Sequence, residues 1–157
     1  MKGKIAVFLF VCLTGLIGCT DHALIDENEA IEDSNWSNKQ AREFTTTVKD
    51  VSVPYHVYLN IRNSMEYSFA NLSVLFRQIN PDKTTKTYRV NVVLADKEGL
   101  WIGKGAGNLY AHQVRFLKNH HFPDTGVYIF QIEHNMRLDP LTGITDIGLR
   151  VAPVNTD

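Results

Sequence analysis

The chain has 157 residues, of which 44% are hydrophobic and 21% are charged, a balance typical of one folded globular domain. Lys and Arg together number 16 against 17 Asp and Glu, so the formal net charge is −1. Because binding to nucleic acid depends on an excess of positive charge facing the phosphates, this composition argues against a nucleic-acid partner.

The first 18 residues have the layout of a bacterial export signal. Lys2 and Lys4 precede an uncharged apolar run of 12 residues, Ile5–Leu16, which is shorter than the roughly 20 residues of a membrane-spanning helix. The following tetrapeptide, Leu-Ile-Gly-Cys19, resembles the lipobox of bacterial lipoproteins, in which the cysteine thiol receives diacylglycerol, the chain is cut before it and the new amine is acylated. We expect residues 1–18 to be a lipoprotein signal peptide, and a plain signal peptide is the alternative.

Cys19 is the expected lipid attachment site and the link of the protein to the membrane. One acyl chain gives only marginal membrane binding, whereas two or three hold a protein durably. The only other cysteine, Cys12, lies inside the expected signal peptide, so the mature chain has no thiol for a disulfide, a zinc site or nucleophilic catalysis.

An acidic stretch follows the lipobox. Residues 21–33 contain six Asp and Glu and no Lys or Arg, a pattern typical of a solvated segment. We interpret residues 19–35 as an acidic tether that keeps the domain clear of anionic head groups, with a surface-export signal as the alternative. Residues 36–157 are then the folded domain.

The body of the chain alternates apolar and polar residues with a period of two. Val57, Leu59 and Ile61 share one face while Tyr58 and Asn60 share the other, as expected for a half-buried strand. Further strands are expected at residues 44–48, 72–76, 88–94, 110–120, 128–132 and 147–151. The 110–120 segment would also suit a short helix.

Turn signals separate these segments: Asn80-Pro81-Asp82, residues 96–99, Pro123-Asp124 and Asp139-Pro140. Each contains residues that favour or tolerate turn dihedrals. Short strands at such intervals predict an all-β antiparallel sandwich of the immunoglobulin-like or jelly-roll-like kind.

The glycine-rich run of residues 99–107 is not a phosphate-binding loop. Only three residues separate Gly99 from Gly103-Lys104, and Gly105 stands where a Walker A loop needs Ser or Thr. These glycines are expected to allow unusual backbone beside Trp101.

Other patterns give weak evidence for chemistry. Asp124-Thr125-Gly126 is the tripeptide of aspartic proteases, but it occurs once and in a turn. The six histidines have no metal-binding spacing, and His120 and His121 would point to opposite faces of a strand. We therefore predict no enzyme, no metal site and no cofactor. Exposed Trp101, Tyr110 and Tyr128 could stack on sugar rings, so a carbohydrate-binding lipoprotein of a glycan-uptake system is the alternative function.

Several stretches together resemble the gliding-motility lipoprotein GldH family of Bacteroidetes. Besides the lipobox, the likeness covers nearly the whole mature domain, at residues 58–62, 67–72, 94–105, 122–130 and 136–148. It implies a lipoprotein required for gliding and associated with assembly of the type IX secretion apparatus, without an established active site, metal or cofactor. It also implies a place in the cell envelope, in the outer membrane and facing the periplasm, with other gliding and secretion proteins as partners.

Partner-binding residues follow from general interface chemistry. Arginine is favoured at interface centres for its planar fork of donors, so Arg62 and Arg137, together with the large indole of Trp101, are candidate contacts. The alternative for either arginine is an ordinary ion pair with a carboxylate of the domain.

Overall fold

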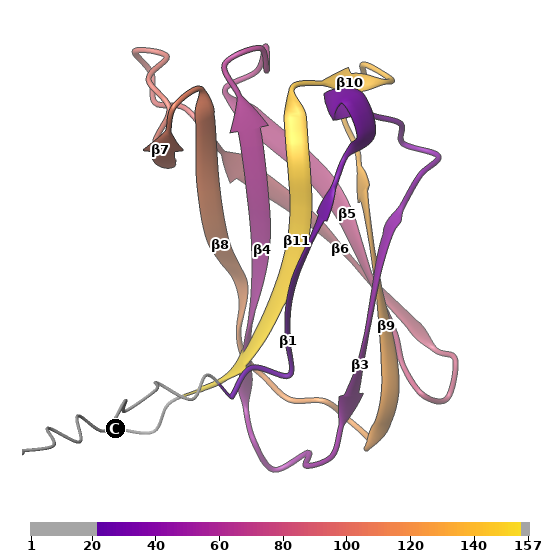
Figure 1. Cartoon of the computed structure of the whole chain (residues 1–157). Helices are drawn as coiled ribbons and strands as arrows, with labels where there is room; N and C mark the ends of the chain where they lie inside the picture. The colour runs from indigo at the N-terminus through magenta and orange to yellow at the C-terminus, as the bar shows by residue number, and fades with distance from the viewer. Residues whose placement is uncertain (1–21, 155–157) are drawn as a thin grey trace, which may run out of the picture.

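The computed structural model describes residues 22–154, which fold as two antiparallel sheets packed face to face (Figure 1). The front sheet has the order β1 (Ile25–Ala30), β11 (Ile144–Pro153), β4 (Tyr55–Ser64), β8 (Leu109–His120) and β7 (Lys104–Ala106). The back sheet has the order β3 (Arg42–Val48), β9 (Gly126–His134), β5 (Asn71–Ile79) and β6 (Thr85–Val93). The expected all-β sandwich is confirmed.

A third, very small sheet closes one end of the sandwich. It pairs β2 (Asn35–Trp36) with β10 (Leu141–Thr142) and follows a 3₁₀ turn, η1 (Glu32–Ser34). Trp36, on β2, is fully buried. This pairing therefore ties the N-terminal part of the chain to the segment that leads into β11.

The period-two alternation of the sequence places the core between the sheets. Along β4 the buried Val57, Leu59 and Ile61 alternate with half-buried or exposed residues. The same alternation holds on the other main strands, and their buried side chains form one cluster that includes Phe44, Leu72, Val74, Phe76, Phe130, Ile132, Ile147, Leu149 and Val151. Sheet faces that bury such side chains against each other supply most of the folding free energy of a sandwich.

The 110–120 segment is a strand rather than a helix, as expected. It forms β8, which pairs with β4 from Leu109 to His120. Its exposed edge is partly covered by β7.

The prediction of a tether over residues 19–35 is wrong for its larger part. Residues 25–30 are β1, which pairs with β11 from Ile25↔Val151 to Ala30↔Asp146. Ile25 and Ile31 are buried in the core. The acidic side chains of β1 point mainly to solvent, so their charge is compatible with an edge strand held by backbone hydrogen bonds.

The first and last described residues lie at the same end of the sandwich (Figure 1). The chain enters at one end, where Leu24 N donates to Val151 O, and leaves at the same end, where Val154 N donates to Pro54 O. We call this the proximal end. The opposite end, formed by residues 64–71, 93–109 and 135–143, is called the distal end. The longest strand, β8, has 12 residues, and the 10 residues of β4 or β11 correspond to roughly 33 Å.

Candidate functional site

Three loops of the distal end are joined by backbone contacts. Met65 N donates to Asn108 O (3.2 Å) and Leu94 N donates to Ala70 O (2.7 Å). Gly143 has φ +90°, and a Cβ atom there would lie 2.5 Å from Tyr67 N. A glycine is therefore required at this close approach, and the 64–71 loop packs directly against the segment that starts β11.

Large apolar side chains are exposed mainly at this end. Among the residues that the structure describes, seven such side chains are exposed, and five of them lie at the distal end: Met65, Val93, Leu100, Ile102 and Leu138. The remaining two, Val51 and Val127, lie toward the proximal end. Gatherings of exposed apolar side chains commonly mark contact surfaces for other molecules.

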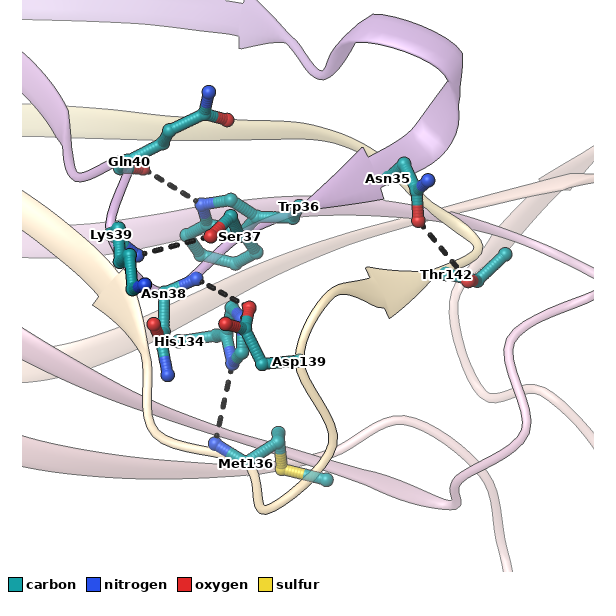
Figure 2. Close-up of polar contacts among 10 residues, drawn as sticks. All are labelled: Asn35, Trp36, Ser37, Asn38, Lys39, Gln40, His134, Met136, Asp139 and Thr142. Atoms are coloured by element: carbon teal, nitrogen blue, oxygen red, sulfur yellow. Dashed lines mark hydrogen bonds and ion pairs between the residues drawn. The ribbon is translucent and has the colours of Figure 1, made fainter.

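The loop of residues 135–140 is held at its start by a buried histidine (Figure 2). Met136 N donates to His134 Nδ1 (3.4 Å), and Asn135 N donates to Ser73 O (2.7 Å). The imidazole of His134 also packs edge-on against the buried indole of Trp36, with ring centroids 5.3 Å apart. These contacts fix the first residues of the loop on the core.

The same loop is held at its other side by a carboxylate. Asn38 N donates to Asp139 Oδ1 (2.8 Å), as Figure 2 shows. This hydrogen bond, with lesser help from the side chains of His134 and Ser37, lowers the pKa of Asp139. Nearby, Trp36 Nε1 donates to Gln40 O (3.1 Å). The 36–40 segment and the 135–140 loop are thus fastened to each other across about a hundred residues of sequence.

The pairing of Asp139 with His134 does not suit acid–base catalysis. Nδ1 of His134 accepts from Met136, so the proton of the neutral ring sits on Nε2. Nε2 lies 3.4 Å from Asp139 Oδ1, an ion-pair distance without hydrogen-bond alignment. Both ring nitrogens therefore face groups of the protein itself, and the pair acts to hold the loop.

The fastened loop borders an apolar hollow. Phe69, Asn135, Met136, Arg137 and Leu138 line this hollow, whose volume is about 500 Å³. Leu138 is 51% exposed, and Arg137 is exposed and forms no ion pair with any described carboxylate. We call these five residues the distal hollow.

Trp101 supports the distal end rather than pointing free into solvent. Its ring lies between those of Tyr110 (centroids 5.8 Å apart) and Tyr67 (6.3 Å), and Tyr67 in turn packs on Phe69 (5.7 Å). The Tyr67 hydroxyl donates to Asn71 O (2.8 Å), and burial raises its pKa. The row of four rings reaches the edge of the distal hollow at Phe69.

Arg62 lies on the outer face of β4, away from the distal hollow. Its side chain is 46% exposed and its Nη1 lies 3.4 Å from Asp146 Oδ2. It lines a trough of about 670 Å³ whose lining includes the polar residues Asp26, Asn60 and Lys104 as well as the exposed apolar Val93 and Ile102. Of the predicted contact residues, the structure therefore brings Trp101 and Arg137 to the same end and leaves Arg62 on a neighbouring face.

The expectation of exposed aromatic rings for sugar stacking is wrong for Tyr128. This side chain is fully buried, and its hydroxyl donates to Asp124 O (2.8 Å). Trp101 and Tyr110 are half-buried, and their rings lie tilted against each other at 35°. No face of Tyr128 is left for a sugar ring.

The glycine-rich segment behaves as expected. Gly99 and Gly107 have φ +84° and +63°, in the left-handed region. At Gly103 a Cβ atom would lie 2.7 Å from the ring of His112, so glycine lets this segment approach β8 closely. The glycines of this segment are explained by its backbone geometry, and the segment forms no phosphate loop.

The described residues offer neither a metal site nor a membrane-spanning helix. Residues 22–154 contain no group of three or more His, Cys, Asp or Glu side chains placed to hold a metal ion. In the same residues, no helix has the length and hydrophobicity to span a membrane. Cys19 lies outside the described residues, so its predicted role stays a prediction.

The sequence suggested Arg137 as a contact residue but not the residues that position it. His134 was one of six histidines without a pattern, and Asp139 was noted only as part of a turn. Phe69, Met136 and Leu138 carry no periodic signal because they lie in loops. Only the clustering of Met, Arg and Leu at residues 136–138, directly before the Asp-Pro turn, could have drawn attention to this loop.

The fold and the distal end together define a small β-sandwich domain with an exposed apolar surface at the end remote from its first described residue. A family model described as "GldH lipoprotein" matches residues 23–151. The chain belongs to this family. As a member of a lipoprotein family, it is a lipid-anchored protein of the cell envelope.

Two relatives cover almost the full chain. One, from Christiangramia forsetii, is named "Gliding motility lipoprotein GldH homolog" and is 26% identical over 159 residues, covering 96% of this chain and 97% of its own. The other, "Gliding motility lipoprotein GldH" of Flavobacterium johnsoniae, is 24% identical over 158 residues, covering 96% and 98%. No solved structure matches the chain.

Proposed function

We propose that this protein is a non-catalytic scaffold required for gliding motility, which supports assembly of the gliding and type IX secretion machinery. It is anchored by lipid on Cys19, including an N-terminal acyl chain such as palmitate, in the outer membrane, with its domain in the periplasm. The names of both relatives support the link to gliding.

The observation that carries the scaffold proposal is the difference between the two ends of the domain. The described chain begins at the proximal end, three residues after Cys19 in the sequence, whereas five of the seven exposed large apolar side chains of residues 22–154 lie at the distal end. A lipid anchor fixes one end at the membrane and presents the other end to partners. A rigid domain used in this way needs no reaction of its own.

The test replaces Cys19 in the bacterium that carries this chain. Cys19→Ser removes the acceptor for the lipid, and we expect the variant to lose labelling by radioactive palmitate, spreading of colonies and secretion of type IX cargo. Asp124→Asn, a change in an exposed turn, is the matched control and should leave all three unchanged. Loss of function in Asp124→Asn together with full function in Cys19→Ser would favour an enzyme instead.

A further inference from the structure

We propose that the distal hollow binds a protein segment in which a carboxylate stands beside a large apolar side chain. This inference rests on the proposed scaffold function and names the surface and the chemistry of its partner. Arg137 pairs with the carboxylate, and Phe69, Met136 and Leu138 receive the apolar side chain.

The residue types of the hollow are those that dominate protein interfaces. Phe, Met and Arg are enriched at interface cores, and Arg is among the residues whose loss costs most binding free energy. Arg137 has a charged fork of donors beside an apolar surface, and no described carboxylate satisfies it. A partner that brings its own carboxylate complements this charge.

The loop that carries Arg137 and Leu138 is already ordered. His134 holds it through Met136 N, and Asp139 holds it through Asn38 N, so the exposed residues lie between two fixed points. Ordering a loop on binding costs free energy, and a loop fixed in advance avoids most of that cost. These contacts thus favour binding at the hollow in addition to stabilising the domain.

Other occupants fit the hollow less well. The residues between Cys19 and β1 number five, too few to reach along a strand that spans roughly 33 Å. A second copy that met this hollow with its own hollow would bring no carboxylate to Arg137, because none of the five lining residues is acidic. The membrane that holds the anchor lies at the proximal end. A separate protein with an acidic, partly apolar segment remains the best match.

The experiment is site-specific photocrosslinking of the full-length lipoprotein in living cells. A photoreactive phenylalanine analogue, p-benzoylphenylalanine, replaces Leu138 in one strain and Val127 in another. Val127 is the matched control because it is 52% exposed, against 51% for Leu138, and lies toward the proximal end. We expect position 138, and not 127, to yield a defined product with one envelope protein. The crosslinked peptide should contain an Asp or Glu within a few residues of a large apolar residue.

Charge exchange then tests the role of Arg137. In the position-138 strain, Arg137→Glu should lower the crosslink yield about tenfold or more, while Arg137→Lys retains a larger part of it. Changing the identified carboxylate of the partner to Arg should restore the yield with Arg137→Glu. Arg115→Glu is the matched control, since Arg115 is an exposed cation on β8, and it should leave the yield unchanged.

Several results would overturn the inference. One is a crosslinked product with a second copy of this chain, with lipid or with glycan, or a crosslinked peptide without a nearby carboxylate. Another is the absence of any product from position 138, or equal products from positions 127 and 138. A third is a crosslink yield that Arg137→Glu leaves unchanged. Each of these leaves the scaffold function standing as long as Cys19→Ser still abolishes gliding. If Cys19→Ser glides normally, the proposed function fails whatever position 138 binds.

Discussion

Buried His112 makes the stability of the domain depend on pH. It lies on the core side of β8, where Nε2 is 2.9 Å from Asn63 Oδ1, and burial lowers its pKa. In the unfolded chain the imidazole binds a proton below a pH of about 6.5. The folded form resists protonation, so its contribution to stability is complete above this pH and is lost as the pH falls toward the folded pKa.

We therefore expect His112→Gln to flatten the pH dependence of the free energy of unfolding between pH 7.5 and 5. The slope should fall by up to about 1.4 kcal/mol per pH unit, the limit for one proton. Urea unfolding of the mature chain at several pH values measures this. The exposed His121→Gln is the control, and an equal flattening in both variants would refute the expectation.

At the scale of elements, the sequence predicted the strands that bury a row of side chains. β4, β5, β9 and β11 alternate because each has one face on the core, and this alternation is visible in the residues themselves. β1 gives no such signal, since Ile25 is its one buried residue and the rest of its sequence is largely acidic. Its place is set by backbone pairing with β11, which the side-chain pattern does not encode.

A paired strand and a free tether predict different effects of substitutions in residues 25–30 on the free energy of unfolding. Ile25→Ala should lower the free energy of unfolding by about 2 to 4 kcal/mol, because it removes buried apolar volume. Glu27→Ala, at an exposed position of the same strand, should change it by less than about 0.5 kcal/mol. Denaturant titration of the two variants decides, and an unaffected Ile25→Ala would mean that the segment is a free tether.

The distal loop shows a second limit of sequence reasoning, because its contacts join residues far apart in the chain. Asn38 and Asp139 are 101 residues apart, and no local pattern relates them. Arg137 was predicted from its residue type, whereas the fastening by His134 and Asp139 follows only from the fold.

We expect Asp139→Ala to loosen the 135–140 loop without unfolding the domain. The change removes the acceptor for Asn38 N, so the amides of Asn38 and Arg137 should exchange hydrogen faster while strand amides keep their protection. Hydrogen exchange followed by mass spectrometry measures this. The control is Asp96→Ala, since Asp96 fixes a different loop through Glu98 N and Leu100 N. Slow exchange around residue 137 in Asp139→Ala would show that the carboxylate does not hold the loop.

At the scale of the whole molecule, a lipid on Cys19, as proposed, would leave only a short segment between the membrane and the domain and would so limit the height of the distal end. Five residues separate Cys19 from β1, whereas the domain itself is roughly 33 Å long. Inserting 20 Gly/Ser residues after Thr20 adds a flexible linker with a mean end-to-end distance of about 25 Å. If partners meet the distal end at a set height, colony spreading should fall sharply, although palmitate labelling and protein abundance stay at wild-type levels.

An insert of four residues, which shifts the domain by a smaller distance, should cause a smaller loss. Spreading that is unchanged by the 20-residue insert would mean that the anchor supplies only retention at the membrane and that the orientation of the domain is not used.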